Sequence, residues 1–499
     1  MDDLRSLACP ACLSPFQDSR KTDDLCCDTC GAIYPVVAGL PILHCHPNSL
    51  LGVWTNEIGR LGAELRGAQR RFAAQRGAFP VPVQERGERV LEARLMNQQL
   101  VEDVWQPVTD YLDRIGHRPD LMDGVLNLQS GWSIEGMLPY FLQDWGEEDV
   151  LHRLSALSTD AMARYLDAPP VAAVLGCGAG GLLHRLAPSC DRAFGLDLAL
   201  PILSLAGKVL EGDSLSYVHA SSADAADFSS VEIHGPTRKN ENLMLLGGDV
   251  NVLPFASGQL STVTTQFLLD IVPDSVHLAT EINRVLCDGG IWINFGPPFK
   301  IHGDPPMYRS RNQEDTPAFL EDRGFEVLQI SRERFPFLDS EGQVEWSQRV
   351  ELAPLFFVAR KREKRSSLEE QFAAYFGHQD RTILEIRPRL GTGRSIGLLK
   401  GRTFTRGMAT QDSWQILVEG ARPRPLPPAV AGFYNGLLAA MKNETTLGEI
   451  IDRFAGPARL GEAGMVKLFR VLSHAGLADL GGDRSPAPAT SIRISSGRK

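Results

Sequence analysis

The sequence predicts an α/β protein built on a doubly wound parallel sheet, and three observations support that prediction. From residue 171 onward, short apolar segments alternate with segments of helical periodicity, which is how a parallel sheet is buried between helices. The first apolar segment runs into a glycine-rich turn. Two of the later apolar segments are each followed by an acidic residue. Because ligands bind at the carboxyl ends of such strands, we expect the functional site at that edge.

The glycine-rich turn lies in the stretch VAAVLGCGAGGLLHRLA, between an expected strand and an expected helix. Gly176, Gly178 and Gly180 would let the backbone approach a ligand closely, and the N-terminus of a helix favours polar groups there. Taken alone, the turn fits a dinucleotide-binding fingerprint or a tight turn without a ligand. The segments that follow it narrow the choice.

The second expected strand, in AFGLDLALPIL, ends at Asp197, where a carboxylate suits the free hydroxyls of a ribose. The segment GGDVNVLPF places Asp249 at the end of a third strand. The fourth strand, in STVTTQFLLDIVPD, carries Gln266, which either touches a ligand or bonds at the strand edge. A helix, a glycine turn and a fifth strand follow in EINRVLCDGGIWINFGP. Either acid alone could be a helix cap, but their ordered spacing favours a ligand site.

This ordered set resembles the class I S-adenosylmethionine (SAM)-dependent methyltransferases over residues 165–330. The resemblance implies a Rossmann-like seven-stranded sheet with SAM as cofactor, and it implies that the acid after the third strand meets the adenine amino group. Where the class often has an acid two residues before the first glycine, this chain has Val174. The implied cofactor-binding residues are Gly176, Gly178, Gly180, Asp197, Asp249 and Gln266.

Residues 135–335 also resemble the carnosine N-methyltransferase family. The segments FLQDWGEED, TQFLLDIVPD and GGIWINFGPPF carry the resemblance, together with an insertion between the second and third strands. It implies methylation of an imidazole nitrogen, with a carboxylate that fixes the ring tautomer and stabilises the developing positive charge. Asp270 matches the family's aspartate, and Asn294 would line the same mouth. Alternatively, Asp270 caps the next segment and Asn294 is a strand-end hydrogen bonder.

The turn at residues 296–298 would line this mouth as well. His302 lies one position out of register with a histidine of that family, which leaves the substrate open, and Tyr308 either fills the pocket or lies on an exposed loop.

The N-terminus carries two CxxC pairs, Cys9 with Cys12 and Cys27 with Cys30, separated by 14 residues. This spacing is typical of a zinc ribbon, in which four thiolates hold one structural ion and leave no open position. Cys26 breaks the pair spacing. Residues 5–44 resemble a small zinc-ribbon family that includes the activator subunit of RNA and protein methyltransferases, which implies a scaffolding role.

Charge and hydropathy argue against nucleic-acid binding, membrane insertion and secretion. The chain has 499 residues and a net charge of −10, so nothing in it requires the basic face with which proteins bind nucleic acids. The basic run at residues 360–365 is predicted to be a solvated linker. No apolar run reaches the roughly 20 residues needed to span a bilayer, and the N-terminus lacks the layout of a secretory signal. We therefore expect a cytoplasmic protein that binds neither membrane nor nucleic acid.

The sequence divides into a zinc ribbon (1–48), a helical lead-in (49–130), a methyltransferase domain (131–362), a C-terminal unit (366–480) and a disordered tail (481–499). The C-terminal unit ends in a helical module that looks similar to winged-helix modules, including the peptide-binding domain of the pyrroloquinoline quinone pathway. That resemblance implies a peptide or protein partner.

The favoured function is SAM-dependent N-methylation of an imidazole nitrogen in a histidine-containing small molecule or peptide. One alternative is an RNA methyltransferase guided by the ribbon, which the acidic balance opposes. A second alternative is a non-catalytic SAM-fold scaffold, which the intact glycine turn and both acids oppose.

Overall fold

The computed structural model covers the whole chain, and most of it is described below. The described residues are 4–17, 24–118, 134–146, 149–220, 228–272, 274–296, 314–333, 335–337, 350–352, 354–378, 380–390, 396–405, 408–418, 424–426, 433, 436–437, 439–441, 445–458, 460–474 and 478–480. His302 and Tyr308 lie outside them, as does the predicted tail.

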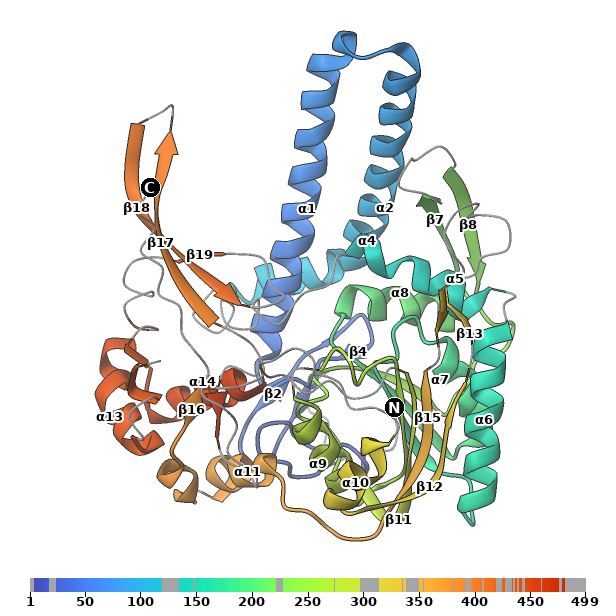
Figure 1. Cartoon of the computed structure of the whole chain (residues 1–499), viewed down its shortest axis with the longest axis vertical. Coiled ribbons are helices and arrows are strands. Elements are labelled where there is room, and N and C mark those ends of the chain that lie inside the picture. The colour runs from blue at the N-terminus through green and yellow to red at the C-terminus, as the bar shows by residue number, and fades with distance from the viewer. Residues whose placement is uncertain are drawn as a thin grey trace.

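A seven-stranded sheet lies in the lower right part of the molecule as drawn in Figure 1. Its strand order is β12–β15–β11–β10–β5–β6–β9. The five strands from β11 to β9 run parallel, and β15 is antiparallel to both of its neighbours. The prediction of a seven-stranded Rossmann-like sheet is confirmed. The strands are β5 (Val171–Leu175), β6 (Arg192–Asp197), β9 (Leu243–Gly247), β10 (Leu260–Gln266), β11 (Leu286–Gly296), β12 (Phe325–Arg332) and β15 (Leu355–Lys361).

Helices cover both faces of this sheet, because both faces of its central strands are apolar. In β5, Ala172 and Val174 join one core cluster, whereas Ala173 and Leu175 join the other. The first cluster includes side chains of α6 (Asp149–Tyr165), α7 (Gly181–Leu186) and α8 (Leu200–Leu210). The second includes side chains of α9 (Ser275–Val285) and α10 (Asp315–Asp322).

The N-terminal segment extends the sheet at its β9 edge. Its short strands are β1 (Leu25–Cys26), β2 (Ile33–Tyr34), β3 (Val36–Val37) and β4 (Leu40–Pro41). Beyond β4, Ile42 forms a parallel bridge with Gly247, whose carbonyl also accepts a 2.6 Å hydrogen bond from the Leu43 N–H. The ribbon is therefore part of the same folded body as the sheet.

Two long helices follow the ribbon and form a hairpin that projects from the body (Figure 1). They are α1 (Pro47–Gln75) and α2 (Val81–Arg114), joined by a short 3-10 turn, Arg76–Ala78. The indole N–H of Trp105 donates to the Thr55 hydroxyl at 2.9 Å and locks the two helices together at their base. The segment after α8 adds a β-hairpin, in which β7 (Ser214–Ala220) pairs with β8 (Phe228–His234). The side-chain amide of Asn97 in α2 donates to the Val218 carbonyl of β7 and accepts from the Val218 N–H.

Two small segments precede α6 and lie over the carboxyl ends of the strands. They are α4 (Ile134–Met137) and α5 (Pro139–Trp145), which packs against α7. A two-stranded sheet, β13 (Phe335–Phe337) with β14 (Val350–Leu352), lies near α6.

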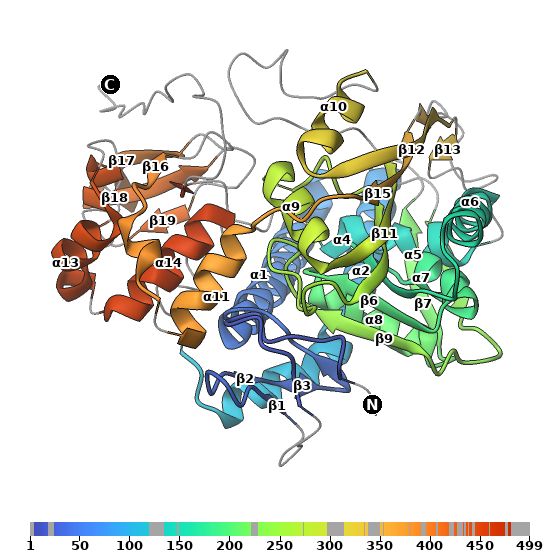
Figure 2. The ribbon, with the colours of Figure 1, turned by 90° about the horizontal axis from the view of Figure 1, so that it is seen from below.

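The C-terminal unit begins with α11 (Leu368–His378), and a 3-10 turn follows at Thr382–Glu385. Its later helices are α13 (Leu447–Ala458) and α14 (Glu462–His474). Thr446 begins α13 with a capping box, in which its backbone and that of Glu449 exchange bonds with each other's side chains. The strands pair as β16 (Arg389–Leu390) with β20 (Ala478–Asp479) and as β17 (Ile396–Thr405), β18 (Met408–Val418) and β19 (Arg424–Leu426). Figure 2 shows α11 and α14 between the ribbon and the rest of this unit.

The basic run at residues 360–365 is not wholly a linker, which corrects the prediction. Arg360 and Lys361 belong to β15, and the Lys361 ammonium is buried, where it donates to the Leu286 carbonyl at 2.6 Å. The sequence pattern did not predict a strand here because Lys361 counts as a polar residue, although its aliphatic stem packs like an apolar side chain. Within the described ranges, no helix combines the length and apolarity needed to cross a membrane.

Candidate active site and metal centre

A cavity of about 220 Å³ opens at the carboxyl ends of the sheet strands. Of the residues predicted to bind cofactor, it brings together Gly176, Gly178, Asp197, Asp249 and Gln266. These residues come from four strand ends, so the parallel sheet itself gathers them. Gly180, Asp270 and Asn294 are not among the lining residues.

The glycine turn is held in a backbone conformation that only glycine adopts readily. Gly176 has φ +68° and Gly178 has φ +51°, both in the left-handed region. Leu268 lies 3.2 Å from where a Cβ on Gly176 would be, whereas a Cβ on Gly178 would meet no atom of the described residues within 4 Å. The backbone of Gly178 therefore borders open space that a ligand can fill. Gly180, with φ +84°, precedes α7 and packs towards Leu210 instead.

Asp197, the last residue of β6, is fixed by two backbone groups. Its carboxylate oxygens accept hydrogen bonds from the Gly178 N–H and from the Ala199 N–H, each at 2.8 Å. Burial raises the pKa of Asp197, and these N–H groups counteract the shift by stabilising the charged form. The acid therefore braces the glycine turn while still facing the cavity.

Asp249 lies two residues beyond β9 and is buried. One of its oxygens accepts from both the backbone and the side-chain amide of Asn251, at 2.9 and 2.8 Å. The side-chain oxygen of Asn251 is itself buried and makes no hydrogen bond within the described part of the protein. A buried polar atom in a cavity wall is a place where a ligand donor is favoured.

Helix α5 supplies site residues to which the sequence analysis gave no role. The Asp144 carboxylate accepts from the Gly181 N–H at 2.9 Å, and the Trp145 indole donates to the Ala179 carbonyl at 2.8 Å. Burial raises the pKa of Asp144 to about 7, while the Gly181 N–H and the Arg185 charge oppose the shift. The adjacent Gln143 is buried in the cavity wall, and its Oε1 has no hydrogen-bond partner among the described residues. The segment FLQDW resembles a motif of the carnosine N-methyltransferase family, but its position in the sequence did not predict its contact with the glycine turn.

The remaining wall is largely apolar and lies next to the end of β10. Phe267 has φ +46°, which is strained for a residue with a Cβ. Its N–H donates to the Phe295 carbonyl at 2.8 Å, and a Cβ on Gly296 would come within 2.9 Å of its backbone. The glycine of the Gly-Pro stretch therefore makes room for this bend. Leu268, Ile271 and Tyr140 complete this wall.

Asp270 lies in the turn after β10, half-buried and two residues past Leu268. The negative charge of Asp270 acts on Tyr140. Burial raises the pKa of this phenol, and the Asp270 and Asp144 carboxylates raise it further. Tyr140 therefore stays protonated at neutral pH and can donate a hydrogen bond.

Asn294 is fully buried in β11, away from the cavity. Its oxygen accepts from the Thr265 hydroxyl at 2.8 Å, and its amide donates to the Leu355 carbonyl at 3.0 Å. These bonds join β10, β11 and β15 just behind the site. The geometry matches the alternative interpretation, that Asn294 is a strand-end hydrogen bonder.

The four cysteines of the two CxxC pairs converge at one point. The Cys9 and Cys30 sulfurs lie 3.6 Å apart, and those of Cys12 and Cys27 lie 3.5 Å apart. All four Sγ atoms are close enough together to hold one metal ion, and such separations suit a tetrahedral zinc with bonds of about 2.3 Å. The Tyr34 hydroxyl lies 2.9 Å from the Cys9 sulfur, where it would donate to a thiolate and stabilise it. Cys26 is exposed and outside the cluster.

Comparisons with known proteins agree with the class of fold. Residues 174–294 match the family model described as "Methyltransferase domain". No curated protein sequence matches the chain.

Among solved structures, the chain is similar to the YcgJ protein from Bacillus subtilis, at 13% identity with TM-score 0.31, over 42% of this chain and 99% of the other. It is similar to magnesium protoporphyrin IX methyltransferase from Synechocystis with bound SAH (S-adenosylhomocysteine), at 13% identity with TM-score 0.30, over 45% and 94%. It is also similar to a chain of the Haloferax volcanii complex that contains the Trm112 methyltransferase activator, at 18% identity with TM-score 0.32, over 47% and 100%.

The family match covers the glycine turn, both acids and the strands between them. The chain is therefore an enzyme, a SAM-dependent methyltransferase, and the matched methyltransferase domain spans residues 174–294.

Proposed function

We propose that this enzyme transfers the methyl group of SAM to an imidazole nitrogen of a histidine-containing small molecule or peptide. The observation that carries the proposal is the composition of the cavity. At one end it has the glycine turn with Asp197 and Asp249, and at the other an aromatic and apolar wall with few polar groups.

The residues present fit SAM. The glycine turn borders open space in the cavity wall, and Asn251 and Gln143 each present there a buried oxygen that has no partner among the described residues. Asp197 would hold the ribose hydroxyls, Asp249 would face the adenine amino group, and Gln266 would contact the cofactor from the end of β10. When bound, SAM supplies an electrophilic methyl sulfonium.

The acceptor end favours a small, flat ring. Phe267, Leu268 and Ile271 provide apolar surface, and Tyr140 provides a hydroxyl donor. A neutral imidazole is nucleophilic at one nitrogen and carries its proton on the other. Orientation of that ring towards the methyl group supplies much of the rate enhancement in a transfer of this kind.

Asp270 is the group we propose to accept the imidazole N–H and to stabilise the positive charge that develops on the ring. The Asp270 carboxylate is near enough to Tyr140, which lines the cavity, to raise the pKa of that phenol, and this supports the role together with the resemblance of TQFLLDIVPD to the carnosine N-methyltransferase family. For Asn294, the buried bonds to Thr265 and Leu355 support a positioning role behind the site.

We further propose that the four cysteines bind one structural zinc ion. Their four sulfurs form a closed set with no place for a substrate, so the ion would stabilise the ribbon. The C-terminal unit remains our candidate for contact with a peptide partner, because its helices border the ribbon and the cavity.

The experiment is methyl transfer from labelled SAM to carnosine, histidine-containing peptides, bulk RNA and a cell-extract metabolite fraction, with the wild type and Asp270→Asn side by side. We expect label on imidazole compounds and a loss of about 10²–10³-fold in kcat for the variant, the size expected when a group that stabilises transition-state charge is removed.

Label on RNA alone would contradict the imidazole proposal and favour the ribbon-guided alternative. Label on imidazole compounds that is unaffected by the variant would remove Asp270 from the mechanism. SAH binding, measured by calorimetry on both proteins, separates a lost acceptor contact from a lost cofactor site.

A further inference from the structure

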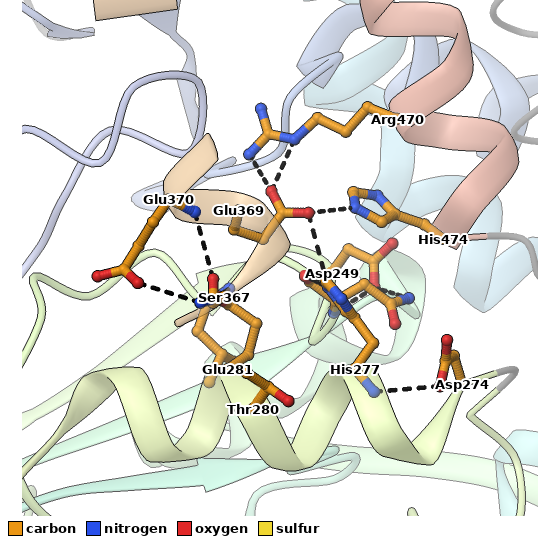
Figure 3. Close-up of polar contacts among 12 residues, drawn as sticks. Asp249, Asp274, His277, Thr280, Glu281, Ser367, Glu369, Glu370, Arg470 and His474 are labelled. Carbon is orange, nitrogen blue, oxygen red and sulfur yellow. Dashed lines mark hydrogen bonds and ion pairs between the residues drawn. The ribbon is translucent and has the colours of Figure 1, made fainter. Parts of the chain in front are cut away.

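One wall of the cofactor cavity comes from the far end of the chain. His474, the last residue of α14, is buried and lines the cavity together with Asp249 and Asn251. Figure 3 shows its ring turned towards Glu369, with Asp249 and His277 close by. The C-terminal unit therefore takes part in the site that the methyltransferase fold begins.

Glu369 holds the His474 ring in place. Its Oε1 lies 2.8 Å from the His474 Nε2 and 3.6 Å from the His277 Nε2. Burial alone would raise the pKa of this fully buried carboxyl group, but the charge of Arg470 and the hydrogen bond to His474 hold it well below its ordinary value. Because the carboxylate accepts at Nε2, the proton of a neutral His474 lies on Nε2, and the lone pair of Nδ1 remains available to a ligand.

Arg470 connects this pair to the ribbon. Its guanidinium donates to the second oxygen of Glu369, from Nε at 2.7 Å and also from Nη2. It donates further to the carbonyls of Pro10 at 2.7 Å and Ala11 at 3.3 Å, the two residues between Cys9 and Cys12. The position of His474 thus depends on a buried ion pair that is itself anchored on a cysteine knuckle.

The cluster His277, Glu369 and His474 is compact enough to hold a metal ion, but its hydrogen bonds argue against one. Both Glu369 oxygens already accept, and the His277 Nε2 lies 2.7 Å from the Asn251 carbonyl, to which it donates. A divalent ion would also lie beside the buried Arg470 cation, and uncompensated buried charge is costly. The arrangement is that of a hydrogen-bonded clamp.

We propose that His474 is a nucleoside-binding residue contributed by the C-terminal unit, and that Glu369 and Arg470 position it from the zinc ribbon. The inference rests on the proposed function, in which Asp249 marks the adenine end. In that orientation the His474 Nδ1 would accept a hydrogen bond from an amino or hydroxyl hydrogen of the nucleoside. The cofactor site is then complete only when ribbon, sheet and C-terminal unit are assembled.

The test is calorimetric binding of two probes, SAH and adenosine, to the full chain. We expect His474→Ala to weaken both by about tenfold, as the loss of a buried hydrogen bond to a ligand does. We expect Glu369→Gln to weaken both as well, because its single amide oxygen cannot accept from His474 and Arg470 at once and the ring is held less firmly. Glu462→Gln is the matched control: Glu462 also lies on α14, but it bonds Tyr375 and Arg381 away from the cavity, so affinities should not change.

Equal affinities for wild type and His474→Ala would overturn the inference and leave the proposed function intact. A loss for SAH but not for adenosine would also overturn it, because His474 would then serve the amino-acid arm. Absence of SAH binding to the wild type would instead overturn the proposed function and, with it, this inference.

His474→Gln, which keeps a polar group at the site, guards against misfolding of the alanine variant and should regain part of the affinity. Metal content is measured on the same samples. If the wild type binds a second metal ion and His474→Ala does not, the cluster is a metal site and the proposed hydrogen-bonding role of His474 is wrong.

Discussion

Arg470 donates a hydrogen bond to the carbonyl oxygen of Pro10 at 2.7 Å, although 460 positions separate the two residues in the sequence. Pro10 lies inside the first CxxC pair and Arg470 lies one helical turn before His474. The contact makes the first CxxC pair, α14 and the cavity that His474 lines one connected structure. Changes at the four-cysteine cluster should therefore affect the far end of the chain.

Replacement of Cys12 by serine should reduce bound zinc from about one equivalent per chain to near zero, because three thiolates hold zinc far less tightly than four. The loosened knuckle should also release the carbonyls that Arg470 binds, so amide hydrogens of α14 should exchange faster. Atomic absorption and hydrogen exchange measure the two effects. Cys26→Ser is the matched control, since Cys26 is exposed and outside the cluster; unchanged exchange in α14 after zinc loss would contradict the coupling.

Asp197→Asn should weaken SAH binding by about ten- to a hundredfold, the cost of one or two charge-assisted hydrogen bonds. The carboxylate accepts from two backbone N–H groups, and an asparagine would turn an NH₂ towards one of them. Calorimetry with SAH measures the change, with the exposed Asp213→Asn as control. An affinity within twofold of wild type would show that this carboxylate braces the turn without serving the ligand.

Asp144 should make stability depend on pH. Its pKa is raised to about 7 in the folded protein from 3.8, so the folded state binds the proton more tightly than the unfolded one. The stabilisation is therefore complete at low pH and is lost as pH rises from about 4 to about 7, on the order of 3 to 5 kcal/mol in all. Asp144→Asn removes this titration. When the pH is raised from 5 to 8, the denaturant midpoint of the variant should therefore fall less than the midpoint of the wild type. Parallel losses in the two proteins would show that the carboxyl group is not shifted in this direction.

Gln143→Leu should have opposite effects on the free and the liganded protein. The Oε1 atom is buried without a hydrogen bond among the described residues, which costs about 1 to 3 kcal/mol, so an apolar side chain of similar size should raise the melting temperature of the free enzyme. If a ligand donor satisfies that oxygen, SAH or acceptor affinity should fall at the same time. Thermal shift with and without SAH, and the KM for the acceptor, measure both. A variant stabilised equally in both states would mean that no ligand reaches Gln143.

Much of the sheet could be predicted because its signals are local. The run VAAVL is a strand buried on both faces, and the glycines after it adopt the positive φ angles that their residue type permits. Asp197 ends its strand as expected, since a strand boundary and an acid are adjacent in the sequence. The two CxxC pairs likewise indicate a metal cluster from spacing alone.

Other assignments depended on side-chain direction, which a single sequence does not encode. Asn294 and Gln266 both lie at strand ends, yet only Gln266 lines the cavity, because Asn294 is occupied between Thr265 and Leu355. The strand that carries Gln266 ends there, so Asp270 lies in a turn and not on the strand.

The sequence by itself determined the alternation of strands and helices, the glycine turn, the order of its acids and the cysteine spacing, because each depends on residues within a few positions of one another. Only the tertiary structure decided that Asp144 meets Gly181, that Arg470 meets Pro10 and that His474 lines the same cavity as Asp197 and Asp249. These contacts join segments that no periodicity relates. They form because burial brings the segments together and their polar groups must then find partners.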